Sequence, residues 1–177
     1  MTGGFEDRFV FSAAWLLCWA AASLVYRVLK GKPVFYARPP HLRFREWNAT
    51  GNSHRNWFTR LGGINGCLVV QVTDTELDIH PFVPFNWLFI PEILGIEHRV
   101  PLKNVASVKA IDADRAFTNT VFRKFFKRRG VEVEIVPGEG AREKVSLWLK
   151  HPEGFLAALG VPPGPPGASV RFLRGSR

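Results

Sequence analysis

Residues 9–26 read FVFSAAWLLCWAAASLVY, and this stretch decides how the rest of the chain is organised. It contains no charged side chain. At about 1.5 Å per helical residue it spans roughly 27 Å, which is close to the hydrocarbon thickness of a bilayer. Val28 and Leu29 extend the apolar run if the Arg27 side chain reaches out to the interface. The sequence therefore predicts a transmembrane helix at residues 9–29.

Two other interpretations of this stretch stay open. A cleaved secretory signal has a basic N-terminal region and a shorter apolar core. Here Glu6 and Asp7 precede the run, although Ala20, Ala21 and Ala22 resemble a cleavage site. A buried core helix is the second alternative, but a helix that is apolar on every face is unusual in a small soluble domain. A membrane span is the favoured interpretation.

The charges that flank the run predict its orientation. Arg8 is the one Lys or Arg before it, whereas six cations follow closely: Arg27, Lys30, Lys32, Arg38, Arg43 and Arg45. Lysine and arginine near a span stay on the cytoplasmic side. We therefore expect a short extracytoplasmic N-terminus at residues 1–8, a span in the inner (plasma) membrane, and a cytoplasmic C-terminal domain. These six cations are expected to contact lipid headgroups and to fix the topology.

The overall charge is concentrated in two blocks. The chain has 177 residues, 24 Lys and Arg against 15 Asp and Glu, and a net charge of +9. Residues 27–60 hold eight of the cations with one acid, and residues 115–129 hold six with none. The length suits one domain of ordinary size, or one smaller domain with appendages, and two cysteines exclude a disulfide framework. Because the largest block directly follows the apolar run, the excess charge indicates membrane topology better than it indicates a nucleic-acid ligand.

After the apolar run, the pattern changes from irregular to β-like. Residues 30–64 are basic and contain Pro39-Pro40, so we expect an irregular juxtamembrane connector. Further on, apolar and polar residues alternate as in half-buried strands. Strands are expected at 67–72, 77–80, 100–111, 131–135 and 144–150, followed by a short helix at 151–160. Pro152 suits the first turn of that helix and Gly160 suits its end. The Pro- and Gly-rich residues 161–177 are expected to form a mobile tail.

This order of elements resembles the pleckstrin-homology (PH) superfold, in particular bacterial PH and GRAM-type domains that follow a membrane helix. The resemblance covers residues 65–160. It rests on the hairpin LVVQVTDTELDIHP, the segment HRVPLKNVASVKAID and the final strand and helix KVSLWLKHPEGFLAAL. It implies an α+β fold, with a PH-like antiparallel barrel or sheet behind the transmembrane helix and a C-terminal capping helix. It also implies a binding or scaffolding domain.

A basic insert interrupts this pattern at residues 114–129. Asp114 suits a helix N-cap and Gly130 the position after a helix end. The cations gather towards the end of the insert, where aromatic residues accompany them. They form a candidate patch for anionic lipid or a partner: Phe122, Arg123, Lys124, Phe126, Lys127, Arg128 and Arg129. Such a helix can lie among lipid headgroups, or pack its apolar side on the sheet and leave the cations in water.

The sequence offers no recognisable catalytic, cofactor or metal site. Its histidines lack the spacing of metal ligands, and no glycine-rich stretch continues as a phosphate loop. Glu97, His98 and Arg99 form a polar trio that we interpret as a solvated strand edge. We expect a membrane-anchored, non-enzymatic scaffold that binds a protein partner or anionic lipid headgroups. The alternatives are a small tethered enzyme with a pocket around His80, His98 and Arg99, or a basic nucleic-acid binder.

Overall fold

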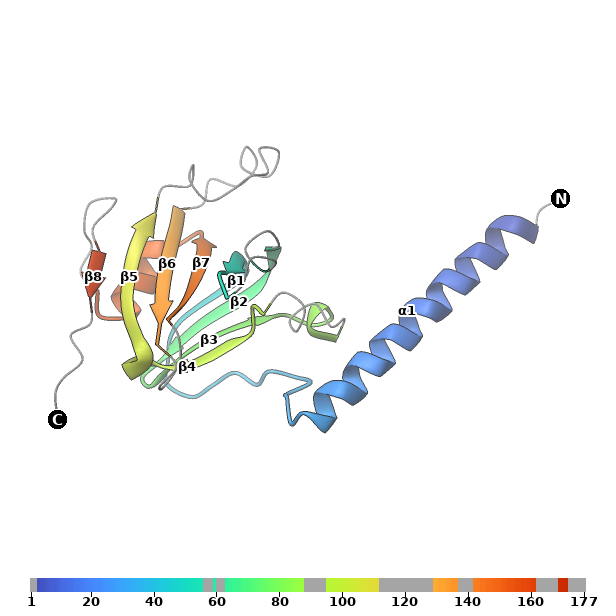
Figure 1. Ribbon diagram of the computed structural model, residues 1–177, viewed down its shortest axis with the longest axis horizontal. Coiled ribbons are helices and arrows are strands. Elements are labelled where there is room, and N and C mark those ends of the chain that lie inside the picture. Colours follow the sequence, from blue (N-terminus) through green and yellow to red (C-terminus); the bar gives the residue numbers. More distant parts are fainter. Residues whose placement is uncertain are drawn as a thin grey trace.

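A long N-terminal helix joins one end of a β-sheet domain in the computed structural model (Figure 1). The structure describes residues 3–55, 59, 63–87, 95–111, 129–136, 142–161 and 169–171. Helix α1 (Gly3–Leu29) projects away from the domain and contacts it near its C-terminal end. Its 22-residue part Arg8–Leu29 is long and apolar enough to cross a membrane. The expected N-terminal apolar helix is therefore confirmed.

The described strands form one antiparallel sheet. They are β1 (Leu42–Ser53), β2 (Ile64–Thr73), β3 (Glu76–Pro81), β4 (His98–Pro101), β5 (Val105–Ile111), β6 (Arg129–Ile135), β7 (Glu143–Leu149) and β8 (Ser169–Arg171). Their order is β4-β3-β2-β1-β7-β6-β5-β8, so two consecutive sets of strands meet where β1 pairs with β7. With α1 and the C-terminal helix α5 (Pro152–Ala158), the fold belongs to the predicted α+β class.

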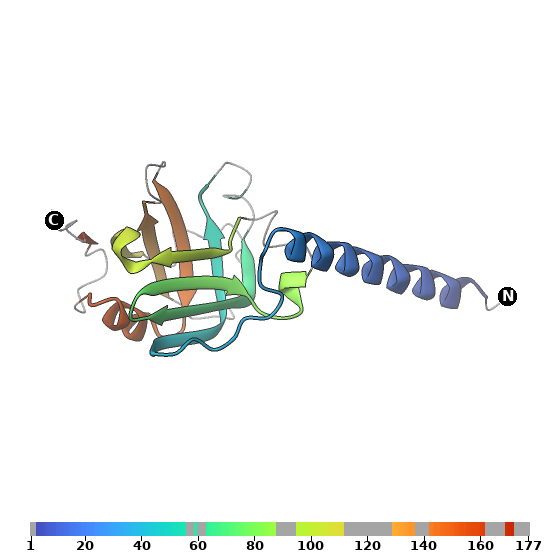
Figure 2. The same cartoon turned by 90° about the horizontal axis from the view of Figure 1, so that it is seen from below.

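A single hydrophobic core lies on the inner face of this sheet. Figure 2 shows β2 and β3 crossing β6 and β7 at a steep angle, so the two halves of the sheet face each other. Their inward side chains, for example Ile79 and Val133, belong to the same buried cluster. Helix α5 packs at one end of this core, where the fully buried Phe155 ring lies 5.6 Å from the Phe44 ring. Burial of these apolar side chains is the main force that stabilises the domain.

A glycine permits the close packing where the two halves of the sheet meet. Gly51 of β1 pairs with Ile64 of β2 and Leu147 of β7. A Cβ atom at this position would lie 2.7 Å from Leu68 Cδ1 and 3.0 Å from Leu147 Cδ2. Both leucines are fully buried, so neither side chain can move away without disturbing the core. A side chain at residue 51 would therefore require these two leucines to shift within the core.

Most predicted elements of the domain are present. The expected strands at 67–72 and 77–80 form the β2–β3 hairpin, and those at 131–135 and 144–150 correspond to β6 and β7. The expected helix is α5, with Pro152 in its first turn. Gly160 follows this helix with φ +74°, the left-handed conformation that a helix end favours.

Three expectations about the chain's organisation are wrong. The connector at 30–64 is not irregular throughout, because residues 42–53 form the central strand β1. The segment 100–111 is not one strand, because the 3₁₀ turn η2 (Leu102–Asn104) separates β4 from β5. The tail at 161–177 contains β8, which pairs with β5.

The basic insert at 114–129 lies almost entirely outside the described residues. Its last residue, Arg129, begins strand β6 and its backbone pairs with Leu149. Gly130, expected just after a helix, is also in β6, where it pairs with Trp148. A Cβ atom at Gly130 would lie 2.6 Å from Ile111 Cγ1, so close strand packing accounts for this glycine. Of the candidate patch, residues 122–128 are not among those described.

Candidate functional site

One face of α1 is covered by the domain over its last two turns. Ser23 and Arg27 are fully buried, and Ala20 and Leu24 are partly covered. These four residues have the i, i+3, i+4, i+7 spacing of a single helix face. The short side chains of Ala20 and Ser23 allow a close approach on this face. One element that contacts α1 is η1 (Phe85–Trp87), a 3₁₀ turn that lies beside the end of α1 in Figure 2.

Arg27 is the last residue on this helix face, and its side chain forms a buried ion pair with Glu97. Its Nη2 lies 3.0 Å from Glu97 Oε1, and its Nη1 donates to Glu97 Oε2 at 3.4 Å. The Nε and Nη2 atoms also donate to the Pro33 carbonyl, and Nη2 lies 2.8 Å from the Tyr36 hydroxyl. Lys32 Nζ adds a second cation, 3.2 Å from Glu97 Oε2. The helix end, the following segment and the β4 side of the sheet are thereby joined by one network.

The network holds Glu97 in its charged form and Tyr36 in its neutral form. Burial alone would raise the pKa of Glu97, but hydrogen bonds from Tyr36 and Arg27 and the charges of Arg27 and Lys32 lower it on balance. Burial and the hydrogen bond to Glu97 raise the pKa of Tyr36. The Tyr36 hydroxyl therefore donates to Glu97 Oε1 while it accepts from Arg27.

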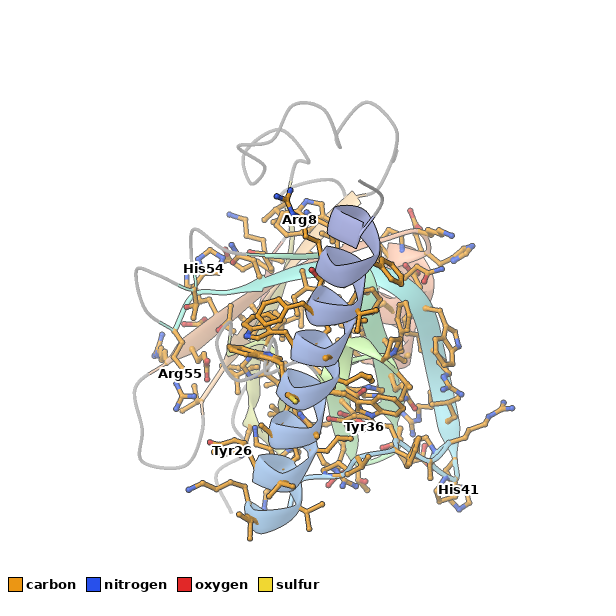
Figure 3. The ribbon with its side chains drawn as sticks, turned by 90° about the vertical axis from the view of Figure 1, so that its right-hand side faces the viewer. Arg8, Tyr26, Tyr36, His41, His54 and Arg55 are labelled. Carbon is orange, nitrogen blue, oxygen red and sulfur yellow. The ribbon has the colours of Figure 1, made fainter. Side chains whose placement is uncertain are left out.

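His80 supports this network from the sheet. Its ring stacks on the Tyr36 ring, with centroids 3.6 Å apart and planes inclined by 7°. Figure 3 shows Tyr36 over the sheet beside α1. His80 Nδ1 lies 3.1 Å from the Pro81 carbonyl, and His80 Nε2 lies 2.9 Å from Gln71 Nε2. A proton on Nδ1 satisfies both contacts, because Nδ1 then donates to the carbonyl and Nε2 accepts from the amide.

Burial disfavours the charged forms of His80 and its neighbour Asp78. Burial lowers the pKa of His80 to about 4. Burial also raises the pKa of Asp78 to about 6, against the opposing charge of Arg99. His80 is therefore uncharged at neutral pH, whereas Asp78 is mostly ionised.

An aromatic surface adjoins the network. We define it as Phe35, Trp47, Phe82, Val83, Phe85 and Trp87, with Arg45 at its edge. Phe35 packs edge-on against Trp87, and Phe82 packs edge-on against Phe85. Trp47 lies 6.2 Å from the Phe82 ring, and the Arg45 guanidinium lies 4.4 Å from the Trp47 ring.

Two side-chain hydrogen bonds fix this surface to the segment that follows α1. Asn86 Nδ2 and Trp87 Nε1 both donate to the Val34 carbonyl, at 2.8 and 3.3 Å. Asn86 is fully buried, so its bond is shielded from competing water. Turn η1, with Trp87 of the aromatic surface, is therefore attached to the segment that follows α1.

The six cations predicted to contact headgroups have different surroundings. Arg27 is buried in protein, which corrects the expectation that it reaches into the headgroup layer. Its buried position is accounted for by Glu97. Lys32 also pairs with Glu97, Arg43 pairs with Asp74, and Arg45 stacks on Trp47. Lys30 lies 6.0 Å from the Tyr26 ring, and Arg38 is exposed.

The residues of the enzyme alternative do not gather into one site. In the β3–β4 pairing, His98 is opposite Ile79 and Arg99 is opposite Asp78. Paired residues share a face of a sheet and successive residues alternate. His98 is therefore on the core face with Ile79, whereas His80 and Arg99 are on the other face. Of the polar trio at 97–99, only Arg99 lies on a solvated strand edge as expected, because Glu97 and His98 are largely buried.

Tyr36 is the central residue that the sequence did not point to, and Glu97 was interpreted only as part of a solvated strand edge. Within the described ranges, no three His, Cys, Asp or Glu side chains gather as a metal ion would require.

A scan against family models, a search of curated proteins and a search of solved structures each found no match.

Proposed function

We propose that this chain is a single-pass inner-membrane protein whose cytoplasmic, PH-like domain is a non-enzymatic binding scaffold. The observation that carries the proposal is the buried Arg27–Glu97 pair at the end of an apolar helix. A charged group that is fully buried away from water is costly unless another protein group neutralises it. The domain supplies that group, together with the Pro33 carbonyl and the Tyr36 hydroxyl.

The arrangement of the domain supports the PH-like part of the proposal. Two sets of antiparallel strands face each other across one core, and α5 packs at one end. This is the arrangement that the resemblance to PH and GRAM-type domains implies. A scaffold of this kind presents loops and sheet edges to a partner, and anionic headgroups or a membrane protein are the ligands that its location makes available.

The orientation is tested with reporters in a bacterial host. Green fluorescent protein and alkaline phosphatase are fused in turn to the C-terminus, because the first is fluorescent in the cytoplasm and the second is active outside it. We expect fluorescence without phosphatase activity. The matched control replaces Lys30, Lys32 and Arg38 by glutamine, which removes cations near the span and should raise the share of inverted chains.

A second measurement separates a span from a cleaved signal. Membranes are washed with alkaline carbonate, and the mass of the retained chain is determined. The proposal requires an intact N-terminus in the membrane pellet. Active C-terminal phosphatase, release by carbonate, or a chain shortened near residues 20–22 would contradict it.

A further inference from the structure

The aromatic surface leaves large apolar groups uncovered. The exposed fraction is 69% for Phe35, 50% for Trp47 and 37% for Val83. Scattered apolar residues are normal on a protein surface, but a contiguous patch usually marks an interaction site. The rings form two contacting sets, Phe35 with Trp87, and Trp47 with Phe82 and Phe85. Residues 82–87 are consecutive and connect the two sets, and Trp87 is hydrogen-bonded to the segment after α1. The position of α1 therefore determines what the surface can meet.

The length of α1 sets the depth of this surface. At about 1.5 Å per residue, Arg8–Leu29 spans about 33 Å, and the hydrocarbon core of a bilayer is about 30 Å thick. A span therefore needs nearly the whole run, including the last two turns where the domain covers Ser23 and Arg27. Turn η1 lies beside those turns in Figure 2. The aromatic surface is consequently level with the place where the helix leaves the hydrocarbon.

We propose that the aromatic surface is buried in the interfacial layer of the leaflet from which α1 emerges. This inference rests on the proposed function, because it takes α1 to be a membrane span. Its ligands are lipid headgroups and the upper parts of acyl chains. Aromatic rings, tryptophan above all, favour this layer, where an apolar body and a polar edge both find suitable surroundings. Arg45, stacked on Trp47, places a cation at the edge of the surface, where anionic lipid phosphates lie.

The surface differs from the basic patch that the sequence suggested. It is aromatic with one arginine at its edge, and it comes from three separate parts of the chain: the segment after α1, strand β1 and the loop that contains η1. Together with α1 it gives the domain two points of attachment to one bilayer. Two attachments restrict the rotation and tilt of the domain, which a single flexible tether does not.

Fluorescent probes in nanodiscs test the depth of the surface. The full-length chain, with Cys18→Ser and Cys67→Ser, carries one environment-sensitive nitrobenzoxadiazole (NBD) label at Val83→Cys or Phe35→Cys. Leu29→Cys is the positive control at the helix end. Lys103→Cys is the negative control, because Lys103 is exposed and η2 lies at the end of the domain away from α1. Nanodiscs contain acyl-chain-brominated phosphatidylcholine and phosphatidylglycerol, and iodide is the quencher in water.

We expect the labels at Val83 and Phe35 to lose most of their fluorescence to brominated lipid, as the label at Leu29 does. They should be shielded from iodide, whereas Lys103 should show the reverse. If the label at Leu29 is quenched by brominated lipid but those at Val83 and Phe35 are quenched by iodide alone, the inference is wrong and the span stands. If brominated lipid quenches no label, including the one at Leu29, the proposed span itself fails.

Discussion

At the level of single residues, burial and ion pairing determine which side chains are charged near the C-terminal end of α1. Arg27 and Glu97 remain ionised together, whereas His80 beside them is neutral. Burial is the main cause that lowers the pKa of His80, and it outweighs the hydrogen bond to the Pro81 carbonyl and the attraction of Glu97. Arg45 and Arg27 add repulsion, and a charged ring would also lose the hydrogen bond that Nε2 accepts from Gln71. Protonation of His80 is therefore opposed by the fold, and this opposition makes stability depend on pH.

Whether stability rises or falls with pH depends on His80 and Asp78, because burial shifts the pKa values of these two groups in opposite directions. The folded pKa of His80, about 4, is below its ordinary value of 6.5. As pH falls between these values the unfolded chain takes up a proton first, so stability falls. The folded pKa of Asp78, about 6, is above its ordinary value of 3.8. The folded chain takes up that proton first, so stability rises as pH falls through this window and partly offsets the effect of His80.

We therefore expect the two variants Asp78→Asn and His80→Gln to change the pH profile in opposite directions. Thermal unfolding midpoints measured from pH 7 to pH 4 should fall more steeply in Asp78→Asn than in the natural chain. They should fall less steeply in His80→Gln, although His98, whose pKa burial also lowers, still contributes. Replacement of the exposed His41 by asparagine is the control. Equal slopes in all four proteins would refute the assignment.

At the level of elements, the start of α5 is held by a side chain from β1. Glu46 is buried on the core face, where its register partner is Val70. Its Oε1 accepts from the Lys150 backbone N–H at 2.6 Å, and its Oε2 accepts from the His151 N–H at 3.0 Å. These are donors that the turn into a helix otherwise leaves without partners. Glu46 thus attaches the capping helix to the central strand.

Replacement Glu46→Gln should loosen α5. The amide keeps one acceptor oxygen and points an NH₂ group at the second backbone donor, so we expect a loss of about 2 kcal/mol in the free energy of unfolding. Hydrogen exchange of amides in residues 150–159 should accelerate more than that of β6. Lys150→Ala is the matched control, because it removes the exposed side chain and keeps the backbone donor. An unchanged exchange rate in α5 would show that Glu46 does not hold it.

The same strand explains where sequence-based prediction fails. Strand β6 was predictable because inward Val131, Val133 and Ile135 alternate with polar residues. In β1 the inner positions include Glu46 and Gly51, while Trp47 lies outside and is half-exposed, so the hydrophobic period is lost. The candidate site could not be predicted from the sequence for a different reason. Arg27 is easily recognised in the sequence because it follows an apolar run. Its partner Glu97 lies 70 residues further along the chain, and no local pattern indicates that these two residues pair.

At the level of the whole molecule, the Arg27 network makes α1 and the domain one unit. In the natural chain, spin labels at Val10→Cys and Lys103→Cys in nanodiscs should give a narrow distance distribution by pulsed electron resonance. Glu97→Gln leaves the Arg27 charge buried without its counter-ion, which costs about 3 kcal/mol. The distribution should then broaden.

The matched control for this measurement is Arg99→Gln. It breaks an exposed ion pair with Glu76 on the neighbouring strand, a kind of contact that contributes less than about 1 kcal/mol. The distribution should stay narrow in this variant. A narrow distribution in Glu97→Gln as well would mean that other contacts orient the domain, and the network would lose the role assigned to it.

The separation of Arg27 and Glu97 along the chain also orders events during synthesis. The two residues are 70 positions apart, so a ribosome adding about 5–20 residues per second makes Glu97 roughly 4–14 s after Arg27. Throughout that interval the Arg27 charge lies behind the nascent apolar helix, and Glu97 does not yet exist. The guanidinium that is fully buried in the folded chain therefore has no carboxylate partner at residue 97 until the β4 side of the sheet has been made.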